Sequence, residues 1–391
     1  MAQRLRNKEK LRSLLTVTMG GATFFTGICL YQGNEKFYNN VMMPLVRLID
    51  PEVAHNLAVL AAKIGFTPRQ TTIDPATLNH TVWGIKFDNP VGMAAGFDKQ
   101  GETMKSLTKM GFGYVEIGSV TPNPQPGNPQ PRVFRLLKDR GVINRYGFNS
   151  DGHDVVLNRL KVVRDDPNFT GIIGVNLGKN KTSEDPIKDY IDGIKKFNNV
   201  ADYFVINVSS PNTVGLRNLQ NKKQLEELLS AINSVRFKMT VQPPLLLKLA
   251  PDLTNDERQD IVDVILKEKT KVDGLILTNT TISRENLLDD NKIESGGLSG
   301  APLTDLSTAV IADMFKRTKG RIPIIGVGGI FSGQDAYDKI AAGASLIQIY
   351  TSYAYHGPPI VQKIKRELND LIISNGYNSI ADVIGKNSEI K

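Results

Sequence analysis

Four small polar side chains gather at the end of one apolar segment. Residues 205–208 suit a buried strand, and Pro211 cannot continue a hydrogen-bonded ladder. The polar residues are Asn207, Ser210, Asn212 and Thr213. Amides and hydroxyls both donate and accept hydrogen bonds, and a serine whose own proton can leave is able to act as a base. Taken alone, the pattern is also typical of a strand that runs into an Asx or serine turn.

Repetition of this pattern favours a functional site over a simple turn. Eight short, continuously apolar runs occur from residue 90 onward: 91–95, 114–120, 171–177, 203–208, 245–249, 274–277, 323–327 and 346–349. Continuous apolarity is typical of strands buried on both faces, and helix-length segments such as 222–237 and 256–269 separate them. Eight such units over about 270 residues predict an α/β fold, a (β/α)8 barrel.

Most of the runs share a polar or glycine-rich ending. These endings are Ala95-Gly96-Phe97-Asp98-Lys99, Ser119, Asn176, Asn207 to Asn212, Lys248, Thr278-Asn279-Thr280, Gly328-Gly329 and Tyr350-Thr351. In a (β/α)8 barrel the carboxyl ends of the strands carry the active site. The endings therefore predict one functional rim.

The motifs along the chain resemble those of class 2 dihydroorotate dehydrogenases. They are MAAGFDK (93–99), EIGSVTP (116–122), NRYGFNS (144–150), GVNLGKN (174–180), INVSSPNT (206–213), LLLKLAPD (245–252), LTNTT (277–281), GGLSG (296–300), IIGVGGI (324–330) and IQIYT (347–351). The likeness covers residues 35–365. It implies oxidation of (S)-dihydroorotate to orotate in pyrimidine synthesis, with a hydride passing to FMN and electrons then to ubiquinone.

Cysteine usage fits class 2. The only cysteine is Cys29, so the chain forms no intrachain disulfide and no cysteine-ligated iron–sulfur cluster. Class 1 enzymes use a cysteine as the base, whereas Ser210 stands at that position here. The resemblance implies that Ser210 takes the C5 proton, that Thr213 with ordered water relays it, and that Phe148 closes over the substrate.

The resemblance also implies the residues that bind substrate. They are Lys99, Asn144, Arg145, Tyr146, Gly147, Phe148, Asn207, Ser210, Pro211, Asn212, Asn279 and Thr280. Lys99 would pair with the orotate carboxylate, and the asparagines would bind the ring edges, because an amide reads a urea-like edge in both directions. A single asparagine is more often a turn or cap residue.

A third set of residues is expected to bind FMN. It comprises Ala94, Ala95, Gly96, Phe97, Asp98, Ser119, Asn176, Asn207, Lys248, Thr278, Gly300, Gly328, Gly329, Tyr350 and Thr351. Lys248 would place positive charge near the flavin, although a lone lysine at a strand end usually reaches solvent. Glycine-rich loops after the last strands commonly bind phosphate, and no dinucleotide fingerprint follows a strand, which favours FMN over NAD or FAD. No metal site is expected.

The N-terminus predicts a targeting segment and a membrane anchor. Residues 1–12 are basic, like a mitochondrial presequence, and residues 13–30 are uncharged and near the minimum length for a transmembrane helix. A long signal peptide is the alternative. Eukaryotic class 2 enzymes are held in the inner mitochondrial membrane by a single span, with the catalytic body in the intermembrane space, and the sequence fits this arrangement.

A helical hairpin is expected at residues 35–66, between the anchor and the barrel at 80–370. Its helices are predicted at 35–49 and after Asp50, ending at Gly65. By resemblance the hairpin forms a tunnel for ubiquinone, with His55, Arg135 and Tyr350 at its polar end. The alternatives are a hairpin whose apolar faces are wholly buried against the barrel, and, for the three polar residues, helix packing, surface charge and flavin support. Residues 371–391 are expected to form a C-terminal tail.

Composition argues against a nucleic-acid partner. The 391-residue chain has a net charge of +8, of which residues 1–12 contribute +4, and it lacks a basic stripe interleaved with aromatic residues. A dihydrouridine synthase acting on RNA is a second hypothesis, but that family uses a cysteine where Ser210 stands. A catalytically inactive, membrane-tethered scaffold is a third.

Overall fold

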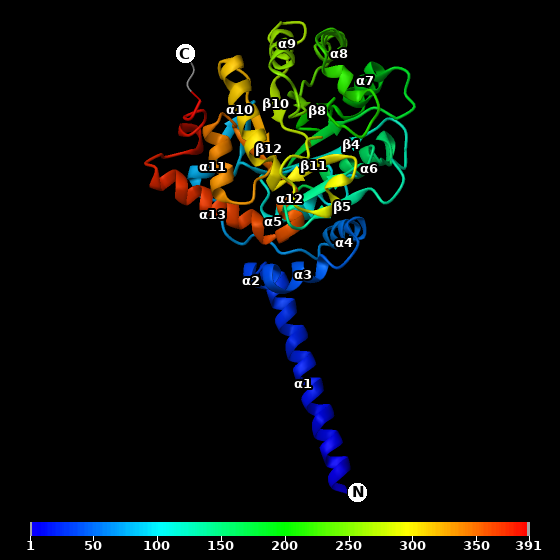
Figure 1. Cartoon of the computed structure of the whole chain (residues 1–391), viewed down its shortest axis with the longest axis vertical. Helices are drawn as coiled ribbons and strands as arrows, with labels where there is room; N and C mark the ends of the chain where they lie inside the picture. The colour runs from blue at the N-terminus through cyan, green and yellow to red at the C-terminus, as the bar shows by residue number, and fades with distance from the viewer. Residues whose placement is uncertain (1, 389–391) are drawn as a thin grey trace.

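The computed structural model, which describes residues 2–388, contains a closed barrel of eight parallel strands (Figure 1). In order around the barrel the strands are β3 (Val91–Met93), β4 (Tyr114–Val120), β7 (Ile172–Leu177), β8 (Tyr203–Asn207), β9 (Leu245–Leu249), β10 (Gly274–Leu277), β12 (Ile324–Val327) and β13 (Leu346–Ile349). Pairing of β13 with β3 closes the ring. The predicted (β/α)8 barrel is confirmed, and every predicted strand lies within two residues of the observed one.

Helices surround the barrel because each buries one apolar stripe against the strands. They are α5 (Met104–Met110), α6 (His153–Arg164), α7 (Pro186–Phe197), α8 (Lys222–Arg236), α9 (Asn255–Ile265), α10 (Thr304–Thr318), α11 (Gly333–Ala341), α12 (Thr351–His356) and α13 (Pro359–Ser374). In α8 the buried Leu225, Leu228, Leu229 and Ile232 show the spacing of a single helix face. The predicted domain boundary at residue 370 falls inside α13.

The barrel interior is filled by large aromatic side chains. Tyr114 and Tyr203 are fully buried inside it, and their rings lie over glycines of the neighbouring strand. A Cβ atom on Gly92 would lie 2.3 Å from the Tyr114 ring, and one on Gly174 would lie 2.1 Å from the Tyr203 ring. The lower part of the barrel is therefore a packed core, which leaves the carboxyl ends of the strands for a site.

Two small sheets complete the body. β1 (His80–Val82) and β2 (Ile85–Phe87) form a hairpin whose Trp83 and Phe87 pack against the barrel interior. β5 (Val133–Leu136), β6 (Gly141–Asn144) and β11 (Gly297–Gly300) form an antiparallel sheet in the order β11-β6-β5. The second sheet brings loops from β4 and β10 together at the carboxyl end of the barrel.

The N-terminal helix α1 (Ala2–Gln32) projects from the body (Figure 1). Within it, Arg6–Gln32 contains an 18-residue window with a mean hydropathy of 1.5 and is long and apolar enough to cross a membrane. The helix predicted at 35–49 is less regular than expected: α2 (Glu35–Phe37), a π-helical segment at 38–42 and α3 (Met43–Val46) follow one another. α4 (Pro51–Lys63) begins after the N-cap Asp50, as predicted.

Polar contacts attach this hairpin to the barrel. Glu52 of α4 forms an ion pair with Arg132, with 2.8 Å between Oε1 and Nη2, and both side chains are nearly buried. Ser106 of α5 donates a hydrogen bond to the carbonyl of Ala62. These contacts do not bury the apolar faces of the hairpin completely, because several of its apolar residues stay exposed: Val41, Leu45, Leu48, Val53, Leu57, Leu60 and Ile64. The alternative of a wholly buried hairpin is therefore wrong.

Candidate active site

Two adjoining cavities occupy the carboxyl end of the barrel. The glycine-side cavity, of about 80 Å³, is lined by Gly300, Gly328 and Gly329, and the asparagine-side cavity, of about 130 Å³, by Asn144, Asn207, Asn212 and Asn279 among others. The two share six residues: Ala95, Lys248, Asn279, Thr280, Ser299 and Tyr350. The strand endings predicted to form one rim thus meet at one place.

Most of the residues predicted to bind substrate line the asparagine-side cavity. They are Lys99, Asn144, Tyr146, Gly147, Phe148, Asn207, Ser210, Asn212, Asn279 and Thr280. The amides also bond one another: Asn212 donates to Asn144 Oδ1 at 3.3 Å, and Asn279 Nδ2 lies 3.3 Å from Asn207 Oδ1. These bonds fix which edge of each amide faces the cavity, so the site can bind a planar, amide-like ring.

Arg145 lies apart from this group. Its guanidinium bonds Glu294 with 2.6 Å between Nη1 and Oε2, and it stacks over the ring of Phe134 at 4.5 Å. Neither Arg145 nor Pro211 is among the residues that line the two cavities. The sequence alone did not reveal the acidic partner, which lies 149 positions along the chain.

Ser210 and Thr213 lie on the loop after β8, and both are buried. Ser210 lines the asparagine-side cavity, and its Oγ accepts a hydrogen bond from the backbone N–H of Asn212 at 3.3 Å. Thr213 Oγ1 has no hydrogen-bond partner among the described residues. A buried hydroxyl without a partner costs free energy, about 1–3 kcal/mol, so Thr213 is suited to bind a water molecule.

Phe148 is held against the cavity wall by its loop. Its backbone has φ = 56°, an unfavourable conformation for a non-glycine residue, and Gln125 Nε2 donates to its carbonyl at 2.8 Å. A Cβ on Gly178 would lie 3.0 Å from the Phe148 ring. The ring thus packs closely on the loop after β7 and can exclude water from one side of the site.

Lys99 is surrounded by groups that set its charge. Its ammonium lies 3.3 Å from His55 Nε2 and 4.0 Å from the centre of the Tyr146 ring, and the surface it still exposes faces the cavity. Desolvation lowers the pKa of Lys99 to about 7. The nearby Glu52 carboxylate raises this pKa, and the Arg132 guanidinium lowers it further. Burial and the Lys99 charge also lower the pKa of His55, which is therefore neutral and able to accept a hydrogen bond.

The sequence reading missed the Glu52–Arg132 pair. Arg132 also lies over the Tyr146 ring at 5.0 Å, so Tyr146 is flanked by two cations. Arg135, predicted to lie at the polar end of the tunnel, donates to the carbonyl of Ile49 at 2.6 Å and so contacts the hairpin backbone. Residues 131–135 contain two arginines, Arg132 and Arg135. The sequence alone did not show which of them faces inward.

Glu116 is a second residue that sequence reasoning missed. It is fully buried on β4, 3.7 Å from Lys248 Nζ, and accepts hydrogen bonds from Asn176 at 2.8 Å and Gln348 at 2.6 Å. A charged residue inside an otherwise apolar strand was the available signal. Ser119 bonds both Asn176 and Asn207, and the predicted Asn176 lines neither cavity.

The remaining predicted residues divide into two groups. Ala94, Ala95, Gly96, Ser119, Lys248, Thr278, Tyr350 and Thr351 line one cavity or the other. Phe97 and Asp98 do not. Phe97 packs edge-to-face against His55 and Tyr350, and buried Asp98 accepts hydrogen bonds from the amides of Glu102 and Thr103. Asp98 therefore shapes the loop that carries Lys99.

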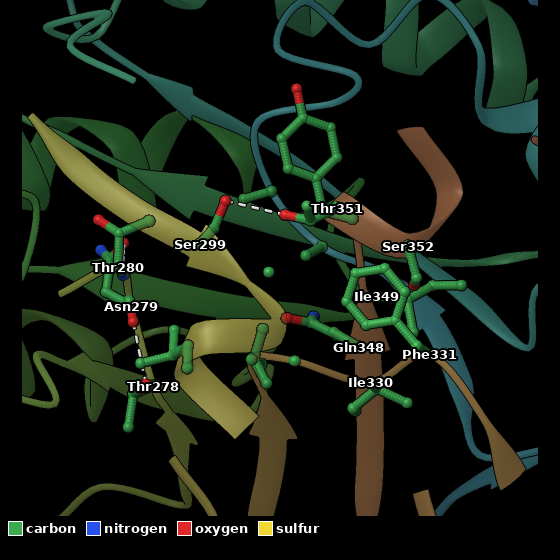
Figure 2. A pocket seen from close by; sticks show the side chains of 18 of the residues that line it. Thr278, Asn279, Thr280, Ser299, Ile330, Phe331, Gln348, Ile349, Thr351 and Ser352 are labelled. Carbon is green, nitrogen blue, oxygen red and sulfur yellow. Dashed lines mark hydrogen bonds between the residues drawn. The ribbon is translucent and has the colours of Figure 1, made fainter. Parts of the chain in front are cut away.

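The glycine-side cavity is suited to an anion. In the described part of the chain the amides of Gly328, Gly329 and Ile330 donate to no protein acceptor. Figure 2 shows Thr351 bonded to Ser299 across this cavity, at 2.8 Å between the hydroxyl oxygens. Free amides next to glycines bind phosphate well. Residues 2–388 hold no group of three metal-ligating side chains.

Comparison with known proteins agrees with this site. The family model described as dihydroorotate dehydrogenase matches residues 77–372. The mouse protein named "Dihydroorotate dehydrogenase (quinone), mitochondrial" is 50% identical, with 98% of this chain and 99% of that protein aligned. The protein of Parvibaculum lavamentivorans named "Dihydroorotate dehydrogenase (quinone)" is 50% identical over 88% of this chain and 96% of its own length.

A solved structure agrees as well. The crystal structure of DHODH from Eimeria tenella in complex with ferulenol superposes with a TM-score of 0.83 at 44% identity, and the match covers 86% of this chain and 96% of that one. The alignment with the mouse protein covers nearly the whole chain, so it includes the barrel and its rim. The chain therefore belongs to the dihydroorotate dehydrogenase family, in its quinone-linked class 2.

Proposed function

We propose that this enzyme oxidises (S)-dihydroorotate to orotate with FMN as its cofactor and ubiquinone as its electron acceptor. The observation that carries the proposal is the grouping of Ser210, four asparagines and Lys99 around one cavity, beside a glycine-lined anion site. Membership of the family sets aside the RNA-modifying alternative.

The residues present fit FMN. The free amides of Gly328 and Gly329 suit its phosphate, and the buried Gln348 Oε1, which has no partner among the described residues, faces the same cavity. Lys248 lies where the two cavities join and can place positive charge beside the ring system. FMN, when bound, supplies the two-electron chemistry that links the two substrates.

The chain's own residues would hold the substrate by its charge and its ring edges. Lys99 pairs with the carboxylate, because a buried ammonium gains most from an anionic partner. Asn144, Asn207, Asn212 and Asn279 bind the ring, since amides offer both donors and acceptors. Together they orient one face of the ring toward the FMN site.

Proton removal is assigned to Ser210. A serine is a poor base unless its own proton leaves, so a water held by Thr213 would accept that proton. The two side chains are three positions apart on one loop, and Thr213 Oγ1 has its bonding capacity free among the described residues. Phe148 keeps bulk solvent from the reacting carbon.

The hairpin is assigned to quinone entry. Its exposed apolar side chains offer a path for a lipophilic molecule, and His55 and Tyr350 lie where the hairpin meets the cavity, with ring centres 6.4 Å apart. α1 would anchor the enzyme in the inner mitochondrial membrane, with the body in the intermembrane space. The mitochondrial names of the relatives and the apolar Arg6–Gln32 support this placement.

Replacing Ser210 tests the proton step. Ser210→Ala should retain FMN and bind orotate, yet lose flavin reduction by about 10²- to 10⁴-fold, because that is the usual contribution of base catalysis. Ser210→Cys should keep more activity than Ser210→Ala. Rapid mixing with dihydroorotate measures the rate, and reduction of the alanine variant at the wild-type rate would remove Ser210 from the mechanism.

Charging the hairpin surface tests the quinone path. Leu45→Glu with Leu57→Glu should leave flavin reduction by dihydroorotate unchanged and raise the ubiquinone KM about tenfold, the effect of about 1.4 kcal/mol of lost binding. Val162→Glu, at an exposed position of α6, is the matched control. The two half-reactions are measured separately, and unchanged quinone turnover would mean that the hairpin serves only packing.

Replacing Lys99 and replacing Lys248 should have different effects on ligand binding and on its pH dependence. Because only protonated Lys99 attracts a carboxylate, orotate should bind most tightly below pH 7 and progressively more weakly as the pH rises through the pKa of about 7. Lys99→Met should bind weakly at every pH. Lys248→Met should preserve the pH dependence but retain FMN poorly and reduce slowly, and identical defects in both variants would show that the two roles are misassigned.

A further inference from the structure

Lys339 is a buried cation that lines neither of the two cavities. It lies on α11 with no exposed surface, and its ammonium contacts Ser307 Oγ at 2.6 Å, Thr308 Oγ1 at 2.8 Å and the Thr304 carbonyl at 3.2 Å. In the described part of the chain no carboxylate lies within ion-pair distance of it. A fully buried lysine without a counter-ion is rare, because desolvation of the charge is costly.

The contacts of Lys339 lead directly to the glycine loop after β12. Ser307 Oγ lies 3.0 Å from the Gly328 carbonyl, and Thr304 Oγ1 donates to the Gly329 carbonyl at 2.8 Å. The fit is close: a Cβ on Gly329 would lie 2.1 Å from Thr304 Oγ1. The first turn of α10 therefore sits between the ammonium and the loop whose free amides face the cavity.

The charge balance of this region calls for an anion. The ammonium lies at the N-terminus of α10, the positive end of the helix dipole, so two positive features reinforce each other. Burial lowers the pKa of Lys339 to about 7, with Asp335, Asp305 and Asp338 opposing at longer range. An anion at the glycine loop would stabilise the protonated lysine.

We propose that Lys339 is a positioning residue for the FMN phosphate, which holds the glycine loop through Ser307 and compensates phosphate charge from beneath it. The inference rests on the proposed use of FMN and adds a residue that does not line the cavity. No contact between Lys339 and the phosphate is required, because one hydroxyl links the ammonium to the loop.

The hydroxyl groups of Ser307 and Thr308 make the hydrogen bonds around Lys339 sensitive to the protonation of its side chain. A protonated lysine donates all three hydrogens, which leaves the Ser307 hydrogen for the Gly328 carbonyl. A neutral amine has two hydrogens, and the Thr304 carbonyl can only accept, so a hydroxyl of Ser307 or Thr308 must then donate to the nitrogen. Where Ser307 is that donor, loss of the Lys339 proton competes with the bond that holds Gly328.

The other charged groups that act on Lys339 are three carboxylates. Asp305 approaches from α10, and Asp335 and Asp338 belong to α11 itself. Carboxylates in general are ionised at pH 8. FMN free in solution has also lost its second phosphate proton at pH 8, since that pKa is about 6. Lys99 also has a pKa of about 7, so it is the part of the proton uptake at pH 8 that disappears in Lys339→Met that reports on Lys339.

The test compares FMN with riboflavin, which lacks the phosphate. In detergent-solubilised full-length protein freed of flavin, Lys339→Met should weaken FMN binding about tenfold or more, as loss of a nearby charge predicts. Riboflavin binding, followed by the same fluorescence quenching, should change less than about threefold. Calorimetry at pH 8 in two buffers should show proton uptake with FMN in the wild type and less in the variant.

Controls separate the outcomes. Lys365→Met removes another buried lysine, paired with Asp74 away from the site, and should leave the FMN-to-riboflavin affinity ratio unchanged. If Lys339→Met fails to fold, the FMN-to-riboflavin affinity ratio is measured for Ser307→Ala in its place. An unchanged ratio would overturn the inference and leave the proposed function intact, whereas a wild-type protein that binds no FMN would overturn both.

Discussion

The buried ion pair between Glu52 and Arg132 joins the two parts on which the account depends. It ties the hairpin, proposed to admit quinone, to the loop after β4 that forms a wall of the site. The same two side chains act on Lys99 from opposite directions, Glu52 raising and Arg132 lowering its pKa. Removing one partner of such a pair typically costs about 3–5 kcal/mol, so packing of the hairpin and charge at the site are coupled.

Buried cations are a recurring feature of this rim. Desolvation brings the pKa of both Lys99 and Lys339 near 7, and neither has a carboxylate within ion-pair distance in the described residues. Lys248, by contrast, lies near buried Glu116. Lys99 and Lys339, which have no carboxylate partner in the described residues, lie near the two places where the proposed ligands carry negative charge. These are the substrate carboxylate and the cofactor phosphate. Binding energy would thus come from charge that the protein keeps unpaired.

The sequence predicted the barrel well because its signals are local. Continuous apolar runs mark strands buried on both faces, and their endings had to converge once eight such strands formed a closed barrel. Pairings between distant segments carried no such signal: Glu52 with Arg132, Glu116 with Lys248, and Arg145 with Glu294 became visible only in three dimensions. Periodicity also could not reveal the π-helical segment at 38–42.

The most direct test of the account is an anaerobic titration of the purified full-length protein. Dihydroorotate added to the flavin-loaded enzyme should bleach the visible flavin absorbance, and a soluble ubiquinone added next should restore it without oxygen. Orotate should appear in proportion to the quinone consumed. A flavin that stays oxidised with dihydroorotate, or that is reduced but not reoxidised by quinone, would contradict the proposed reaction.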